Sequence, residues 1–443
     1  MEYRVHTPCG VLRGCAGRSG TAVYKGIRYA TAGRWEYPRQ VTAWEGVYDA
    51  TKFGKACYQP GSFSQESVTG KSFYHNEFRK DEVYEYSEDC LFLNIYTPDT
   101  AKPGDKLPVL VYIHGGAFVG GRAHEKQFRD PVWPQQGVIG VTIHYRLGPL
   151  GFLCLPELKK EAGHSGNYGL YDQMTAIRWV KDNISAFGGD PENITIMGQS
   201  AGAVSVQQLC LSPLTEGLFQ KAVMCSGGGN PSGFVLEKEE DRYAYWKHFQ
   251  EYAGCENVAQ LRALTPREIF AAFDRTKAEL KGRGYYPCID SVFLPQDAKS
   301  HKIPYMIGAT SEDIMLPELQ EVAKQWADTQ DKPSFVWQFN RRLPGDDKGA
   351  WHSADLWYWF GSFHNCWRPM EEKDRQLSGQ MVDYLCSFAQ IGNPNSSGKQ
   401  PLWRASSRQD PAVMLLGEQE TGMGIPKTNE EGEHEPKRKG ESE

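Results

Sequence analysis

One serine of this sequence stands in a setting that favours nucleophilic chemistry. It lies in Gly198-Gln199-Ser200-Ala201-Gly202, between the apolar run Ile194–Met197 and a run of small residues. A serine at a sharp strand-to-helix turn presents its hydroxyl outward, and flanking glycines remove Cβ atoms that would collide in that turn. The pattern therefore predicts that Ser200 is a nucleophile for acyl transfer.

A glycine-rich turn supplies the second candidate element. His114-Gly115-Gly116-Ala117-Phe118 directly follows the apolar run Leu107–Ile113. Acyl transfer passes through an oxyanion, which preorganised backbone N–H groups stabilise, and small residues let the backbone approach the substrate. We predict an oxyanion hole built from the N–H groups of Gly116, Ala117 and Ala201, the last at the positive end of the helix after the serine.

A nucleophilic serine also needs a base. In the chain order serine, acid, histidine, the base follows the late strands of the sheet. His352 lies in a loop just after the apolar run Ser334–Phe339, and His364 follows shortly after it. We predict His352 as the base, with His364 as the alternative.

The acid that orients this base is expected after the run Ile303–Ile307. The loop there contains two adjacent acids, Glu312 and Asp313. Either could orient an imidazole and stabilise its protonated form, so the residues alone leave both open.

The sequence pattern of the elements that must hold these residues indicates an α/β fold. Short apolar runs alternate with segments of helical period, which is typical of a large, mostly parallel sheet flanked by helices. Tyr171–Phe187 has helical spacing, and Glu237–Arg283 reads as several helices, one opened by Pro266. Since that run falls between two strands, residues 230–302 are predicted to be an inserted helical cap. The predicted strands are Leu107–Ile113, Val138–His144, Ile194–Met197, Lys221–Cys225, Ile303–Ile307 and Ser334–Phe339.

Composition predicts one catalytic domain, residues 1–417, and a disordered charged tail, residues 418–443. The formal net charge is −6, and eight acidic against four basic side chains place −4 of it in the tail. The nearly neutral body argues against nucleic-acid and anionic-membrane partners. We expect a small-molecule partner and a monomer or homodimer.

No apolar stretch is long enough to span a membrane. The first residues lack the pattern of a secretory signal, so a cytoplasmic protein is expected, or a secreted one if a signal was removed. Eleven cysteines do not form a disulfide framework, although Cys57 and Cys90 could pair or remain buried thiols. No spacing typical of a metal or dinucleotide site occurs, so no cofactor is expected.

Together these motifs resemble the type-B carboxylesterases, the family of cholinesterases and para-nitrobenzyl esterases, within the α/β-hydrolase fold. The resemblance spans most of the chain. It rests on Gly26–Ala30, Ser87–Tyr96, His114–Phe118, Gly169–Gln173, Phe187–Asn193 with the serine turn that follows, Gly349–Leu356 and Gly392–Pro394.

The resemblance implies roles that the residues alone do not settle. It places the acid at Asp313, where most relatives carry Glu, with Glu312 beside it, and it favours His352 over His364. It also suggests that Ser226 is a buried serine that hydrogen-bonds the triad acid.

Two departures from the family bear on the substrate. Only 38 residues separate Asp313 from His352, so a more open active site is expected. Gln199 stands where cholinesterases carry an acid, which argues against a quaternary-ammonium substrate.

The expected activity is hydrolysis of small to medium carboxyl esters through a Ser-His-Asp triad and an acyl-enzyme. The alternatives are a specialised hydrolase of a feruloyl ester, lactone or amide, or a non-catalytic recognition module. The predicted cap and the aromatic residues Trp357–Phe360 and Trp367 are candidates to line the pocket, although such aromatic runs are more often core.

Overall fold

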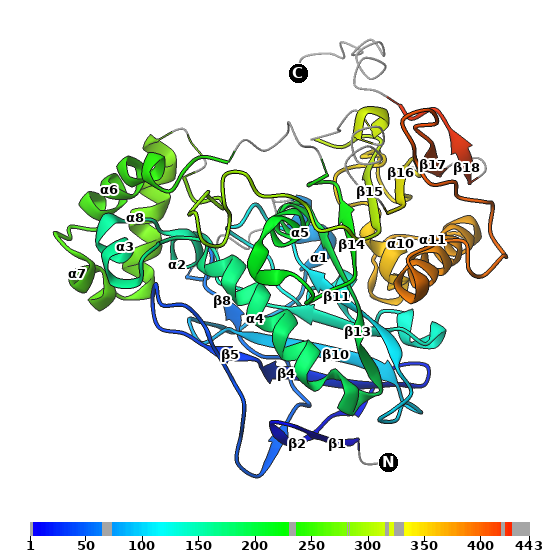
Figure 1. The fold of residues 1–443 in the computed structure, drawn as a ribbon, viewed down its shortest axis with the longest axis horizontal. Helices are drawn as coiled ribbons and strands as arrows, with labels where there is room; N and C mark the ends of the chain where they lie inside the picture. The colour runs from blue at the N-terminus through cyan, green and yellow to red at the C-terminus, as the bar shows by residue number, and fades with distance from the viewer. Residues whose placement is uncertain are drawn as a thin grey trace, which may run out of the picture.

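An eleven-stranded sheet forms the centre of the protein (Figure 1). The computed structural model describes residues 3–63, 73–229, 236–280, 282, 284–314, 319–322, 332–417 and 421–427. The strand order is β18-β17-β16-β15-β14-β13-β11-β12-β10-β4-β3. The strands from β17 to β12 in this order run parallel, and antiparallel strands close both edges. The sheet strands are β3 (Cys15–Ala16), β4 (Thr21–Arg28), β10 (Phe92–Pro98), β11 (Leu107–Ile113), β12 (Ile139–Ile143), β13 (Gly189–Gln199), β14 (Lys221–Cys225), β15 (Tyr305–Thr310), β16 (Ser334–Phe339), β17 (Val413–Leu416) and β18 (Gly422–Gly424).

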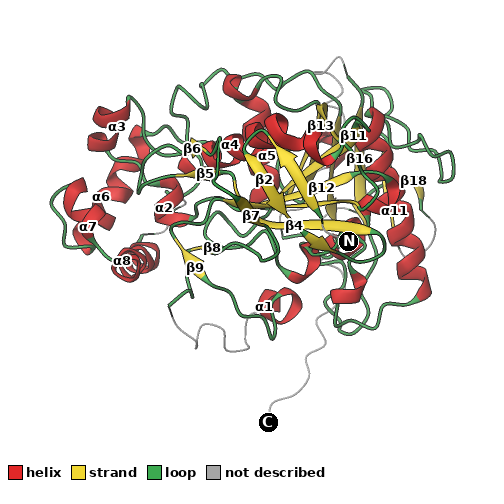
Figure 2. Ribbon diagram, turned by 90° about the horizontal axis from the view of Figure 1, so that it is seen from below, coloured by secondary structure: helices red, strands yellow, loops and turns green. Residues whose placement is uncertain are grey.

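Helices cover both faces of this sheet (Figures 1 and 2). They are α1 (Phe73–Phe78), α2 (Gly148–Phe152), α3 (Pro156–Ala162), α4 (Tyr168–Asn183), α5 (Ala201–Leu211), α6 (Tyr243–Tyr252), α7 (Val258–Ala263), α8 (Pro266–Glu279), α10 (Leu356–Phe360) and α11 (Glu372–Ile391). Short strands form small sheets beside the main one: β1 (Arg4–Thr7), β2 (Gly10–Arg13) and β7 (Val47–Asp49); β5 (Ala30–Thr31) and β6 (Arg39–Gln40); β8 (Ala56–Cys57) and β9 (Tyr86–Ser87). The predicted fold class, a large mostly parallel sheet flanked by helices, is confirmed.

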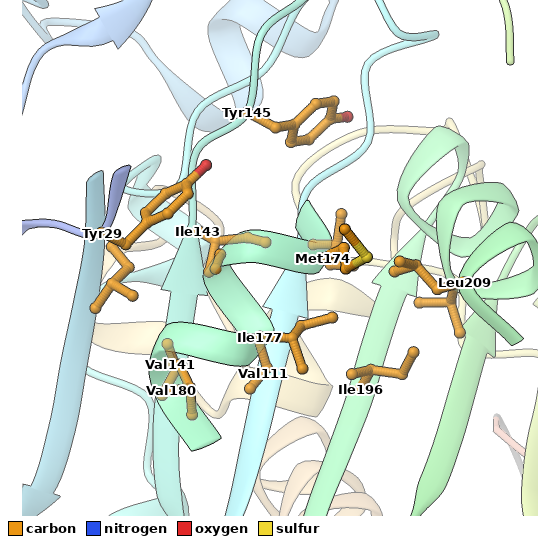
Figure 3. Packing of buried hydrophobic residues seen from close by; sticks show 14 of the residues in the cluster. Tyr29, Val111, Val141, Ile143, Tyr145, Met174, Ile177, Val180, Ile196 and Leu209 are labelled. Atoms are coloured by element: carbon orange, nitrogen blue, oxygen red, sulfur yellow. The ribbon is translucent and has the colours of Figure 1, made fainter. Parts of the chain in front are cut away.

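Alternation along the central strands creates two cores. Val109, Val111 and Ile113 of β11 belong to the cluster that includes α4 and α5, whereas Leu110 and Tyr112 belong to the cluster with α10 and α11. Successive strand residues point to opposite faces, so apolar residues throughout allow burial from both sides. Figure 3 shows the first core, where Val111, Val141 and Ile196 of the sheet lie beside Met174, Ile177 and Val180 of α4.

The helices predicted as an insertion between two strands are present. Helices α6, α7 and α8 lie between β14 and β15 in the chain. Thr265 caps α8 by accepting from the Glu268 N–H, and Pro266 occupies its first turn as predicted. The three helices pack beside α2 and α3 at one end of the sheet (Figures 1 and 2). Their apolar faces are buried in that cluster, where Trp246, Phe249 and Phe273 are fully buried.

The C-terminal boundary of the folded domain was predicted too early. Residues Gly422–Gly424 form β18, which pairs antiparallel with β17 at the edge of the sheet. Met423 packs partly against the core there, a contact that the Gly-rich sequence does not signal. The rest of the predicted tail, residues 418–420 and 428–443, lies outside the described residues.

All eleven cysteines are free thiols, including Cys57 and Cys90, whose pairing the sequence left open. Burial and then the neighbouring Cys90 thiol raise the pKa of Cys57 well above its ordinary value. Within the described residues no helix has the length and apolar character of a membrane span.

Candidate active site

Ser200 sits at the turn between β13 and α5, with φ 57° and ψ −125°. The turn is tight enough to require glycine on both sides. A Cβ on Gly198 would lie 2.2 Å from the Gly202 oxygen, and one on Gly202 would lie 2.1 Å from the Ile113 oxygen. The backbone is fixed by the Ser200 N–H, which donates to Cys225 O at 2.9 Å. This is the strained strand-to-helix turn that the sequence predicts.

The glycine-rich turn after β11 lies directly beside this serine. A Cβ on Gly115 would lie 2.9 Å from the Ser200 Cβ. Gly116, Ala117 and Phe118 all have positive φ, and Gly120 N donates back to Gly116 O at 2.9 Å, which holds the turn. Within the described part of the chain, the N–H groups of Gly116, Ala117 and Ala201 have no hydrogen-bond acceptor. Three unused donors beside one serine can bind an oxyanion.

Asp313 and His352 meet at the carboxyl ends of the neighbouring strands β15 and β16. The Nδ1 atom of His352 lies 2.8 Å from Oδ1 of Asp313, and both side chains are buried. Thr310 Oγ1 donates to the second carboxylate oxygen at 3.0 Å. Tyr74 of α1 donates from its hydroxyl to the backbone oxygen of His352 at 3.1 Å, which fixes the histidine loop. A carboxylate so placed can hold an imidazole with Nδ1 protonated and Nε2 available as a base.

The side chain of Gln199 contacts the Nε2 atom of His352. Its side-chain amide lies 3.2 Å from Nε2 of His352, and both groups are buried. Since an amide N–H donates, the imidazole accepts through Nε2 and carries its proton on Nδ1 toward Asp313. Within the described residues, the Ser200 hydroxyl itself has no hydrogen-bond partner.

Glu312, the other candidate acid, points away from the imidazole. Its Oε1 atom accepts from Arg342 Nη1 at 2.9 Å, with about a third of the side chain exposed. Glu312 N also donates to Ala350 O, so the backbone here is held as a short bridge in which adjacent side chains point to opposite sides. The structure therefore places Asp313, and not Glu312, against His352. His364, the alternative base, lies 3.9 Å from Asp130 instead.

The predicted contact of Ser226 with the triad acid is wrong. Ser226 is fully buried after β14, but its hydroxyl has no hydrogen-bond partner among the described residues. Its φ is 53°, and its backbone N–H donates to Gly308 O at 2.7 Å. The hydroxyl that donates to the Asp313 carboxylate is that of Thr310.

A cavity of about 370 Å³ joins the serine, the histidine and the glycine-rich turn. No residue of the inserted helices lines it, so these candidates do not shape the pocket. Trp357–Phe360 are buried core residues, which is the more common role of such aromatic runs. Its walls come instead from α1 and from the chain after the glycine-rich turn. Sequence reasoning missed these wall residues, because no motif marks them. They include Tyr74, Phe78, Arg79, Glu125 and Phe128.

His114 also lines the cavity and stays neutral. Burial lowers its pKa to about 4, and its Nδ1 atom lies 2.8 Å from Gly115 O. Because that oxygen accepts the Nδ1 proton, the ring braces the oxyanion turn without competing with His352 for a proton.

Known ester hydrolases are similar to this chain in sequence. The sequence model described as "Carboxylesterase family" matches residues 2–330 and 314–434. The chain is 36% identical to the para-nitrobenzyl esterase of Bacillus subtilis (strain 168), over 70% of this chain and 62% of that protein. It is 35% identical to the bile salt-activated lipase of Rattus norvegicus, over 87% of this chain and 75% of that protein. The chain thus spans less than two thirds of the Bacillus relative's length.

Solved structures show the same fold at similar size. A PNB esterase superposes with a TM-score of 0.79 at 27% identity, covering 95% of this chain and 96% of that one. An esterase from Clostridium hathewayi, described as able to hydrolyse aliphatic aromatic polyesters, gives a TM-score of 0.77 at 27% identity, covering 95% of each chain. The chain belongs to the carboxylesterase family and has its α/β-hydrolase fold.

Proposed function

We propose that this protein is a serine hydrolase of small to medium carboxylic esters. The observation that carries the proposal is the shared cavity. It brings together Ser200, the Asp313–His352 pair at 2.8 Å and unused backbone donors of the glycine-rich turn. A cavity of about 370 Å³ suits a ligand of modest size. The names of the para-nitrobenzyl esterase and lipase relatives support the same class of reaction.

In the first step, the Ser200 oxygen attacks the ester carbonyl carbon while His352 Nε2 takes the hydroxyl proton. The Gln199 amide, now 3.2 Å from Nε2, gives way as the hydroxyl turns to that atom. The carbonyl oxygen becomes an oxyanion and accepts from the N–H groups of Gly116, Ala117 and Ala201. Asp313 stabilises the imidazolium without taking its proton.

The tetrahedral intermediate then collapses. The bond to the alcohol oxygen breaks, and His352 returns its proton to that oxygen, so the alcohol leaves and an acyl group remains on Ser200. Water attacks the acyl carbon next, with His352 again taking and returning one proton. The products are the carboxylic acid, the alcohol and the free serine.

The test replaces the nucleophile and a matched surface serine. Ser200→Ala should reduce kcat for para-nitrophenyl butyrate by at least ~10³-fold, because removal of a triad member costs several orders of magnitude. Ser396→Ala, at an exposed loop position, should keep full activity. Equal activity of the two variants would refute the proposal.

A further inference from the structure

The active-site cavity has a charged wall that acyl transfer does not require. Arg79, just after α1, and Glu125, after the glycine-rich turn, both line the cavity with Ser200 and His352. None of the proposed catalytic steps uses either group. Their arrangement therefore bears on which ester the cavity accepts.

Glu125 is already fully engaged by its neighbours. Oε1 accepts from Arg79 Nε at 2.7 Å and from Arg122 Nη1 at 3.1 Å, and Oε2 accepts from Gln127 Nε2 at 3.2 Å. Burial acts to raise the pKa of Glu125, but the two arginines bring it below its ordinary value, so the carboxylate stays ionised. Only 4% of its side chain is exposed. A cationic ligand would find little of this carboxylate to bind.

The wall nevertheless carries an excess positive charge. Two guanidinium groups, of Arg79 and Arg122, face one carboxylate. Two neighbouring acids, Glu77 and Glu82, are paired with arginines of their own at 2.8 Å and 2.6 Å. The buried histidines add no charge, because burial lowers the pKa of His114 to about 4 and that of His124 to about 3.

The two arginines differ in how much of each guanidinium group remains free to bind a ligand. Arg122 is enclosed, with its guanidinium over the rings of Tyr84 and Tyr86 at 4.3 Å and 5.2 Å from their centroids and Nη2 donating to the Tyr86 hydroxyl. Arg79 uses only Nε, and its Nη1 and Nη2 atoms have no partner among the described residues. About a quarter of its side chain is exposed, and the residue lines the cavity. A free guanidinium edge with two parallel N–H groups matches the geometry of a carboxylate.

We propose that Arg79 binds a carboxylate carried by the substrate, so that the protein prefers esters with a free carboxylate beyond the scissile bond. Half-esters of dicarboxylic acids and acyl esters of hydroxybenzoic acids are such compounds. The excess of one positive charge on the wall favours a monoanion. This inference rests on the proposed ester hydrolysis and adds the chemical class of the substrate.

The experiment compares matched substrate pairs. In the acyl pair, para-nitrophenyl valerate is set against para-nitrophenyl hemiglutarate. In the alcohol pair, the butyrate ester of 4-hydroxybenzamide is set against that of 4-hydroxybenzoate. For each pair, the ratio of kcat/KM for the carboxylate ester to that for the neutral ester is measured in the wild type, in Arg79→Gln and Arg79→Lys, and in Arg275→Gln, a control at an exposed arginine on α8.

In at least one pair, Arg79→Gln should lower this ratio by ~10-fold or more, since hydrogen bonds to charged groups contribute that much. The loss should appear mainly in KM, because the contact exists in ground and transition state alike. Arg79→Lys should retain part of the ratio and Arg275→Gln all of it. A ratio unchanged by Arg79→Gln in both pairs would overturn the inference.

Two further measurements accompany this comparison of substrates. In the wild type, added NaCl should raise KM for the preferred carboxylate ester more than for its neutral partner, a result that needs no variant and whose absence contradicts the inference. Covalent labelling of Ser200 by a fluorophosphonate reports whether each variant has a formed active site. If the wild type is neither labelled nor active on the neutral esters, the proposed function fails. If it is labelled and active but does not discriminate through Arg79, only the present inference fails.

Discussion

Asp355 is a buried carboxyl group close to Asp313 and His352, and it should make the stability of the fold depend on pH. It is fully buried, with Oδ2 accepting from Trp359 Nε1 at 3.0 Å and Oδ1 without a partner among the described residues. Burial first, and then the charge of Asp313, raise its pKa from 3.8 to about 7 despite the Trp359 hydrogen bond.

The folded and unfolded states bind the Asp355 proton over different pH ranges. Above pH 3.8 an unfolded Asp355 loses its proton, whereas the folded protein keeps it up to about pH 7. The folded state therefore binds the extra proton between pH 3.8 and about pH 7. The free energy of unfolding is highest below pH 3.8 and falls as the pH rises through this window. A shift of about three pH units corresponds to about 4 kcal/mol at 1.36 kcal/mol per unit.

The perturbation is Asp355→Asn, which keeps an oxygen for Trp359 but cannot ionise. The variant's free energy of unfolding minus that of the wild type should rise by about 1.4 kcal/mol per pH unit between about pH 4 and about pH 7, then level off. Urea unfolding at a series of pH values measures this difference. Asp182→Asn, at an exposed position on α4, is the control and should give a nearly constant difference. A pH-independent difference for Asp355→Asn would refute the reasoning.

Further predictions concern the histidine and its neighbours. Asp313→Asn should lower kcat for para-nitrophenyl butyrate by ~10³-fold or more, because the carboxylate sets the imidazole tautomer. Glu312→Gln should lower the same kcat only a few-fold. Similar losses in the two variants would mean that the acid is misassigned. Gln199→Glu should place a carboxylate at Nε2 of His352, stabilise the imidazolium and move the acid limb of the kcat/KM profile to higher pH by about one unit. An unmoved limb would show that residue 199 does not contact the base in the free enzyme.

Much of the fold was readable from the sequence because its central strands are buried on both faces. β11, β14 and β16 have the bounds that their apolar runs predict. β13 extends back to Gly189 through polar residues, because pairing with β11 continues beyond the apolar run. β18 gave no signal, since edge pairing and one methionine contact hold it.

The candidate site also contains residues that the sequence predicts and residues that it does not. Ser200 and the glycine-rich turn were predictable because steric limits on a tight turn select glycine at fixed spacing. Adjacent Glu312 and Asp313 could not be ranked from their chemistry, because the backbone direction at that bridge decides which one faces the imidazole. The wall containing Arg79 was invisible, since it depends on how α1 folds against a loop more than forty residues away in the chain.

Formation of a covalent acyl-enzyme on Ser200 is the central step of the proposed mechanism. Its most direct test is mass spectrometry of the protein quenched during turnover of a slowly deacylated para-nitrophenyl ester, followed by digestion. The proposed mechanism predicts one acyl group per chain, located on the peptide with Ser200 and absent from Ser200→Ala. Turnover with no acylated peptide, or with the acyl group on another residue, would contradict it.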